Sequence, residues 1–230
     1  MADHSQCCVI SEPLRGKLCE QLSRRPGRRA EAGEFVYLAG GEAQSLFFLK
    51  RGLIKTSRVA PDGRELILQI YRAGEVFGEL CFCTGARREQ ATVLEASEVV
   101  ELPSDDLFNA LRRNPDAVLD LVAIMSDRLS EAQALLQSMA FDSAMVRLVR
   151  QLLAMAERLG SASDDGTHIA HHINQEEFAG LIGSRREVVS GLLNRLRDLH
   201  LIDYPRKGEI TVHTRALQSY LASLSQVDDK

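Results

Sequence analysis

One change of pattern near residue 103 constrains the fold more than any other feature of this sequence. Between residues 34 and 102, short β-branched and aromatic runs alternate with glycines or a Pro-Asp-Gly turn, which is typical of antiparallel strands. From Asn114 to about Met139, by contrast, nothing interrupts a helical pattern. We therefore expect an α+β protein that begins with an antiparallel β-roll, whose closure would cover the strand edges. The predicted strands are residues 35–38, 46–49, 53–56, 66–71, 91–94 and 99–102, and the predicted chain reversals lie at Gly33, Gly40, Gly41, Gly52, Pro61-Asp62-Gly63 and Gly74.

Two helix starts follow the predicted roll. Ser104-Asp105-Asp106 can cap a short helix, and Asn114-Pro115-Asp116 begins a long one, with proline where its missing N–H is harmless. Apolar side chains recur along the long helix at the spacing of a coiled-coil seam, which predicts a dimerisation helix. The alternative is that this stripe packs on its own roll. The stripe comprises Val118, Leu121, Met125, Leu129, Ala132, Leu136 and Met139.

The C-terminal part of the chain carries a helix-turn-helix pattern. Phe141-Asp142-Ser143 interrupts the long helix, and Asp142 or Ser143 is placed to cap a further helix over 144–159. We expect a polar loop over 160–166 and a short strand over 167–173 after it. A helix-turn-helix needs a small residue where its helices touch and a glycine at the turn, which Ala179 and Gly183 supply. The apolar residues that lock the second helix inward are Val189, Leu192, Leu193 and Leu196.

The outward face of that second helix consists of residue types that read DNA grooves. Arginine bonds guanine bidentately and glutamate accepts from cytosine, whereas a charged face without such a frame would be only solvated surface. A hairpin over 201–212 with basic residues at its tip completes a winged helix. The predicted contacts to double-stranded DNA are Asn174, Arg185, Arg186, Glu187, Ser190 and Lys207.

Length, charge and cysteine usage limit the function classes. The pattern predicts an N-terminal tail and roll over 1–113, a dimerisation helix over 114–140 and a DNA-binding domain over 141–230. No apolar run approaches the ~18 residues of a membrane-spanning helix, so we expect a cytoplasmic protein without a membrane partner. The formal net charge of −4 does not exclude DNA, because it averages over both domains. The cysteines are an odd set, expected to be mostly reduced: Cys7, Cys8, Cys19, Cys81 and Cys83.

From about Gly33 to Val212 the chain resembles the cyclic-AMP receptor and fumarate-nitrate regulator (CRP/FNR) transcription factors. Phe77-Gly78-Glu79-Leu80 is similar to the start of the family's phosphate-binding cassette, and Arg186-Glu187-Val188-Val189-Ser190 to its recognition helix. The resemblance implies a cyclic-nucleotide-binding-like jelly roll. It also implies base reading by Arg186 and Glu187 with Ser190 beside them, and a backbone contact from Lys207. Gly191 replaces an arginine common in the family, so the resemblance does not predict the target sequence.

The resemblance also implies an effector pocket in the roll. Relatives that bind cyclic nucleotides place Arg-Ser at the cyclic phosphate, where this chain has Glu89-Gln90, and a glutamate there repels an anion. We therefore do not expect cyclic AMP as the effector. A one-residue slip of the loop would bring Arg88 to the phosphate and keeps a nucleotide open as an alternative. The predicted pocket residues are Gly78, Glu79, Leu80, Arg87, Arg88, Glu89, Gln90, Ala132 and Gln133.

Cysteine offers other sensor chemistries, and the cofactor stays unknown at this stage. Cys81 and Cys83 are open to three interpretations: buried small hydrophobes, redox-active thiols, or haem ligation as in carbon-monoxide-sensing relatives. The N-terminal cysteines lack the spacing of an iron-sulfur site, and the histidines near residue 170 lack zinc spacing, so no metal site is predicted.

These observations predict a homodimeric, sequence-specific transcription regulator whose roll senses a small effector. If it is an activator, RNA polymerase is a further partner. The alternative is a ligand-independent architectural DNA-binding protein with a vestigial pocket. An enzyme is not expected, because no nucleophile-base constellation, Walker loop or zinc motif is present.

Overall fold

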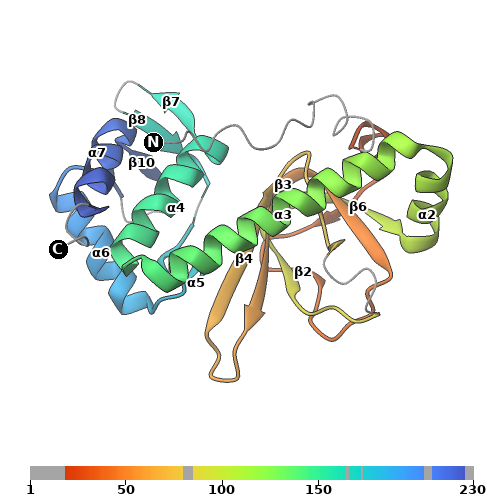
Figure 1. Ribbon diagram of the computed structural model, residues 1–230, viewed down its shortest axis with the longest axis horizontal. Helices are drawn as coiled ribbons and strands as arrows, with labels where there is room; N and C mark the ends of the chain where they lie inside the picture. The colour runs from red at the N-terminus through yellow and green to blue at the C-terminus, as the bar shows by residue number, and fades with distance from the viewer. Residues whose placement is uncertain (1–18, 80–84, 164–165, 172, 205–208, 226–230) are drawn as a thin grey trace. The chain divides into compact units, whose positions relative to one another are not determined.

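The computed structural model describes residues 19–79, 85–163, 166–171, 173–204 and 209–225, which form two compact units. The first unit comprises the chain through Arg58 and Leu68–Gln133. The second comprises Val59–Ile67, which is the tip of a hairpin, and the chain from Ala134 onward. Figure 1 shows the elements of both units.

The first unit is built on an antiparallel sheet. Its six strands are β1 (Arg28–Ala30), β2 (Phe35–Tyr37), β3 (Ser45–Val59), β4 (Glu65–Arg72), β5 (Val76–Phe77) and β6 (Gln90–Pro103). The order is β1-β6-β3-β4, with β2 paired to β6 and β5 paired to β3. Antiparallel pairing is thus confirmed.

The two central strands are longer than the sequence pattern predicts. The runs 46–49 and 53–56 join into β3, and the runs 91–94 and 99–102 join into β6. Gly52 therefore does not reverse the chain, and that prediction is wrong. The strand bulges there instead: its register with β6 shifts between Leu49 and Ile54, Gly52 has φ +91°, and a Cβ atom at this position would overlap Ser97.

The roll encloses an aromatic core. Tyr37 stacks on Phe47 with ring centroids 5.5 Å apart, and Phe47 stacks on Phe77 at 5.3 Å. Tyr71 contacts Phe77 at 5.4 Å. Ring contacts of this kind add to the free energy of burial, so the inner faces of β2, β3, β4 and β5 are held together at these side chains.

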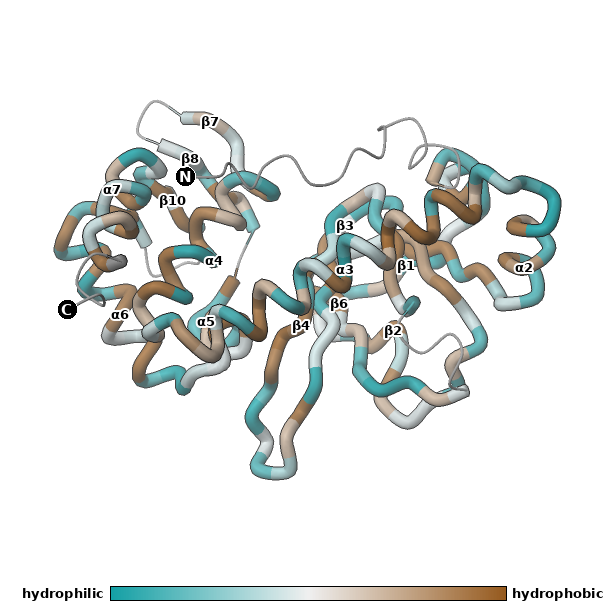
Figure 2. The backbone as a smooth tube through the Cα atoms, in the orientation of Figure 1, coloured by the Kyte–Doolittle hydropathy of each residue, from teal (hydrophilic) through white to brown (hydrophobic). Residues whose placement is uncertain are grey.

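Two helices follow the sheet. α2 (Ser104–Arg113) is capped by Pro103 without a side-chain bond, so the predicted cap at Ser104-Asp105-Asp106 is wrong: Ser104 instead donates its hydroxyl to the Gln44 carbonyl at 2.7 Å. α3 (Pro115–Phe141) begins as predicted, with Asn114 accepting from the Asp116 N–H at 3.2 Å. Figure 2 shows apolar stretches along α3.

The second unit contains helices and a small sheet. Its helices are α4 (Ala144–Leu159), α5 (Gln175–Ile182), α6 (Arg186–Asp198) and α7 (Thr214–Ser225). The sheet order is β7-β8-β10-β9, formed by Ser161–Ser163, Gly166–Ile169, Ile210–Val212 and Ile202–Asp203. α4 begins at Ala144 as predicted, and of the two candidate caps Ser143 is used: its hydroxyl oxygen accepts from the Val146 N–H at 3.3 Å. The polar loop predicted over 160–166 is wrong in part, because β7 forms there as an exposed edge strand with no apolar alternation to reveal it.

No helix in the described part of the chain is long and apolar enough to cross a membrane.

Candidate functional site

The helix-turn-helix consists of α5, a glycine turn and α6. Asn174 and Glu177 form a capping box at the start of α5: Asn174 Oδ1 accepts from the Glu177 N–H at 3.0 Å, and the Asn174 N–H donates to Glu177 Oε2 at 2.9 Å. Gly183 then takes the left-handed conformation with φ 58°. Glycine is favoured here by the left-handed turn; a Cβ atom on Gly183 would also lie 2.6 Å from Met139 Cε, the end of a flexible side chain that can move aside.

The outward face of α6 is exposed as the sequence predicts. Val189, Leu193 and Leu196 are buried, while Leu192 is half-buried. Arg185, Arg186 and Glu187 are exposed at the start of the helix, and Ser190 is half-buried one turn further on. Arg186 Nε lies 4.0 Å from Glu176 Oε2, but both side chains are largely exposed, so this pair is weak and leaves the guanidinium accessible to DNA.

Two predicted DNA-contact residues stand apart from this face. Asn174 is exposed, but its side-chain oxygen is used by the capping box, so its amide N–H₂ is the group left to donate. Lys207 lies outside the described residues. β9 and β10, which flank the predicted wing tip, pair in antiparallel register as a wing requires.

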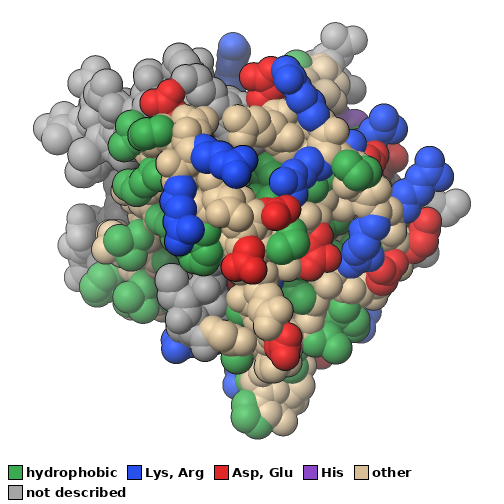
Figure 3. Space-filling model, turned by 90° about the vertical axis from the view of Figure 1, so that its right-hand side faces the viewer, with side chains coloured by type: hydrophobic (Ala, Val, Ile, Leu, Met, Phe, Trp, Pro, Cys, Tyr) green, Lys and Arg blue, Asp and Glu red, His purple; other side chains and the backbone are tan. Residues whose placement is uncertain are grey.

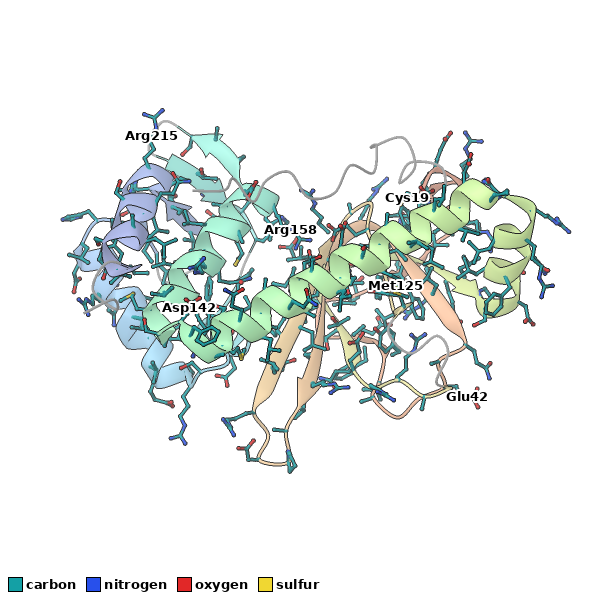
Figure 4. The ribbon with its side chains drawn as sticks, viewed as in Figure 1. Cys19, Glu42, Met125, Asp142, Arg158 and Arg215 are labelled. Atoms are coloured by element: carbon teal, nitrogen blue, oxygen red, sulfur yellow. The ribbon has the colours of Figure 1, made fainter. Side chains whose placement is uncertain are left out.

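A hydrogen-bond network holds the junction between α3 and α4. Asp142 Oδ2 accepts from the Ser138 hydroxyl at 2.6 Å and pairs with Arg150 Nε at 3.1 Å. Figure 4 labels Asp142. Arg147 donates to the Asp142 carbonyl at 2.7 Å and to the Ile182 carbonyl at 2.8 Å. The end of α3 is therefore bonded through one arginine to the end of α5, directly before the turn that leads into α6.

A buried group of charged and aromatic side chains lies inside the roll. We call it the polar cluster. Its members come from β2, β4, α3 and the segment between β5 and β6: Tyr37, Tyr71, Glu79, Arg87, Glu89 and Arg128.

Arg87 is the most enclosed cation of the polar cluster. It is 4% exposed and donates to the Gly78 carbonyl at 2.6 Å and to the Ser45 carbonyl. Its guanidinium lies 4.3 Å from the centre of the Tyr37 ring. Its Nε is buried and has no acceptor among the described residues. Burial of an N–H without an acceptor is costly, so this group is suited to a ligand.

Glu79 links the cluster to α3. It is 2% exposed, and neither carboxylate oxygen accepts a hydrogen bond from the described residues. Arg128 Nε lies 3.4 Å from Glu79 Oε1, within ion-pair distance, and its guanidinium lies 4.7 Å from the centre of the Tyr71 ring. Desolvation raises the pKa of Glu79, against the opposing effect of Arg128.

Glu89 is a second buried carboxylate in the same cluster. It is 2% exposed, and the Tyr37 hydroxyl donates to its Oε1 at 3.0 Å. Desolvation raises the pKa of Glu89, opposed by the bond from Tyr37, and the charge of Glu79 raises it further. Burial likewise raises the pKa of Tyr37, so this hydroxyl keeps its proton and donates.

The structure brings some of the predicted pocket residues together and leaves others outside. Gly78 adjoins the cluster, since its carbonyl accepts from Arg87. Arg88, Ala132 and Gln133 are exposed, Gln90 is half-buried at the start of β6, and Leu80 lies outside the described residues.

The sequence reading missed Tyr37, Tyr71 and Arg128. Arg128 carried no sequence signal: it follows Asp120 by eight residues, about two helical turns, but the burial of Asp120 is known only from the structure. The tyrosines carried no signal beyond those of ordinary strand residues.

Nothing in the described part of the chain supports a metal site or a haem or redox role for the cysteines. Cys81 and Cys83 lie outside the described residues, and the part of the chain that is described holds no group of three or more His, Cys, Asp or Glu side chains suited to a metal ion. A haem or redox role of these cysteines therefore stays an expectation.

Comparison with known proteins assigns both parts of the chain. Residues 27–114 match the family model of the cyclic nucleotide-binding domain, and residues 146–218 match the Crp-like helix-turn-helix domain. A CRP-like cAMP-activated global transcriptional regulator of Mycobacterium tuberculosis is 32% identical over 162 residues, which are 70% of this chain and 72% of the relative. The chain belongs to the CRP/FNR family of transcription regulators.

Other members of the CRP/FNR family agree with this assignment. A global nitrogen regulator of Synechocystis is 30% identical over 181 residues, 77% of this chain and 80% of that protein. The solved structure of a CRP-family transcriptional regulator from Thermus thermophilus has a TM-score of 0.73 at 25% identity, covering 85% of this chain and 96% of that one. The chain is accordingly a transcription regulator with a cyclic-nucleotide-binding-like sensory domain and a helix-turn-helix DNA-binding domain, and not an enzyme.

Proposed function

We propose that the protein is a homodimeric, sequence-specific regulator in which Arg186 and Glu187 read base edges in each half-site. The observation that carries this proposal is the exposed start of α6. Arg185, Arg186 and Glu187 are exposed there, while Val189 and Leu193 on the opposite side of the helix are buried. A helix that presents its first turn in this way fits the major groove. RNA polymerase would be the further partner if the protein activates transcription.

The proposed dimer interface is the exposed apolar face of α3. Leu129 is 61% exposed and Leu136 is 71% exposed, with Val118, Val122 and Met125 also exposed on the same helix. An apolar stripe over 27 helical residues favours a partner helix. Leu121 and Met139, which belong to the predicted stripe, are half-buried instead.

The proposed sensor is the polar cluster, with an effector other than cyclic AMP. Support comes from the Glu79 carboxylate oxygens and Arg87 Nε, which are buried and make no hydrogen bond to the described residues, and from Glu89, whose buried carboxylate opposes a cyclic phosphate. The Glu79–Arg128 pair gives a route for coupling, because Arg128 lies on α3. An effector that alters this pair would shift the populations of α3 arrangements and hence of the DNA-binding form.

The test is binding-site selection on purified full-length protein, followed by affinity measurements on the selected DNA with and without cyclic AMP. We expect a two-fold-related motif, bound by a dimer, with an affinity that cyclic AMP does not change. Absence of any selected motif would contradict sequence-specific regulation and would favour the architectural alternative. A cyclic-AMP effect of the 5- to 150-fold size typical of allosteric coupling would contradict the effector proposal.

A further inference from the structure

Arg87 is a buried and oriented cation, which we call the anchor. Its orientation does not depend on whether the neighbouring positions match the family cassette. Its side chain is 4% exposed, oriented by the Gly78 carbonyl at 2.6 Å and by the Ser45 carbonyl, and stacked 4.3 Å from the Tyr37 ring centre. These contacts leave Nε without an acceptor in the described part of the chain. The roll therefore already holds an oriented, charged donor, and Arg-Ser at positions 89 and 90 is not needed to provide one.

Glu89 is joined to this anchor through Tyr37. The Tyr37 hydroxyl donates to Glu89 Oε1 at 3.0 Å, and the Arg87 guanidinium lies over the ring of the same tyrosine. The other charges that act on Glu89 are those of Glu79, Arg58 and Arg87. A ligand at Arg87 consequently meets a buried carboxylate, and the two carboxylates of the cluster together offset the charge of its two arginines.

We propose that Glu89 is the specificity-determining residue of the effector site: it excludes anionic groups from Arg87 and selects a neutral or zwitterionic polar molecule. Such a molecule presents an acceptor to Arg87 Nε and hydrogen-bond donors to the carboxylates of Glu79 and Glu89. Selection against the anion is electrostatic, because two negative charges inside a region of low dielectric repel strongly. This inference rests on the proposed role of the polar cluster as the sensor.

The experiment uses cyclic AMP and cyclic GMP as anionic probes in calorimetry on the full-length protein. Glu89→Gln removes the charge and keeps an oxygen that accepts from Tyr37. We expect it to bind at least one probe at least about tenfold more tightly than the wild type, equivalent to about 1.4 kcal/mol. The two probes distinguish a gain for the phosphate diester in general from a preference for one base.

Matched variants separate Glu89 from general charge effects. Glu42→Gln removes an equal charge from an exposed side chain at the edge of the roll (Figure 4) and should bind the probes as the wild type does. Adding Arg87→Gln to Glu89→Gln should abolish the gain, and Arg87→Lys is the second variant at that position. Glu89→Ser repeats the charge removal, and circular dichroism of every variant verifies folding.

Equal probe affinity in the wild type and in both folded Glu89 variants would overturn the proposal, whether all bind or none binds. A gain that survives the loss of Arg87 would overturn its role as anchor. DNA affinity is measured in parallel, so that failure of this inference, with DNA binding intact, is distinguishable from failure of the proposed regulator function, in which the wild type would bind no specific DNA.

Discussion

The interiors of the two units differ in chemistry. In the first unit buried charged side chains occur at Lys55, Glu79, Arg87, Glu89 and Asp120, whereas none is found among the described residues of the second unit. The second unit is filled by apolar side chains such as Phe178, Leu148 and Ile202, each at 0% exposure. A buried charge lowers stability unless it is well paired, and an apolar core raises it.

The surfaces of the two units also differ in how their charged side chains are arranged. On the face nearest α2, acidic and basic side chains are interspersed rather than gathered by sign (Figure 3). The start of α6 exposes Arg185, Arg186 and Glu187 next to one another in a single turn. The first unit thus has charged side chains in its interior, where the proposed effector site lies, and the helix-turn-helix has them on its surface, where DNA can be contacted.

The largest effect is expected from opening a cavity in the apolar core of the second unit. Phe178→Ala should reduce the free energy of unfolding by about 3–5 kcal/mol, because a fully buried ring is removed. Chemical denaturation followed by circular dichroism measures the loss. Phe35→Ala is the control, since Phe35 is 46% exposed and should lose less than about 1 kcal/mol. Similar losses for both variants would mean that the second unit does not depend on its apolar core.

A charge on the exposed face of α3 tests whether that face is covered in solution. Leu129 is 61% exposed in the single chain, so Leu129→Glu should leave the fold intact. If a partner helix covers it, the dimer should weaken at least about a hundredfold, because a charge would be buried unpaired. Sedimentation equilibrium should show monomers and the full DNA site should be bound weakly. A wild type that is monomeric at micromolar concentration would refute the dimer.

Base reading by the exposed face of α6 is tested at the first turn of this helix. Arg186→Ala should weaken specific DNA binding by about 1–3 kcal/mol and relax preference at one base pair of each half-site. Arg197→Ala, at an exposed position in the last turn of the same helix, is the matched control and should leave the selected motif unchanged. An unchanged motif and affinity for Arg186→Ala would mean that α6 does not read bases through this residue.

The smallest effect concerns the buried carboxylates. Desolvation raises the folded-state pKa of Glu89 above its ordinary value of 4.5, so the folded protein holds this proton more tightly than the unfolded chain does. Its contribution to stability is therefore full below that ordinary value and is lost as the pH rises through the raised pKa.

Glu89→Gln should remove the loss of stability that the wild type suffers as the pH rises through the raised pKa of Glu89. We expect its Tm to exceed that of the wild type at neutral pH by a few degrees, with the difference shrinking toward pH 4, in thermal unfolding at a series of pH values. Glu42→Gln, which is exposed, should follow the wild type. A Tm difference for Glu89→Gln that does not change with pH would show that Glu89 does not hold its proton more tightly in the folded state.

Much of the fold could be predicted because it depends on local pattern. The antiparallel strands, the start of α3 at Pro115, the cap at Ser143 and the glycine turn at Gly183 each follow from short-range chemistry. Gly52 shows the limit: glycine predicts an unusual backbone conformation, but whether that is a turn or a bulge depends on the pairing of β3 with β6. β7 was also not predicted, because its three small residues, Ser161–Ser163, form a strand only when β8 lies beside them.

By itself the sequence determined the family, the fold class and the recognition helix, because these depend on periodicity and on a contiguous motif. Tertiary structure decided which of the cassette residues are enclosed: Arg87 and Glu89 are buried and Arg88 between them is exposed, in an irregular segment before β6 where no sequence periodicity marks the difference. It also brought Tyr37, Tyr71 and Arg128 to the same place from β2, β4 and α3. The physical reason is that burial and electrostatic partners are non-local, so the polar cluster, which is the proposed effector site, forms only once the roll has closed.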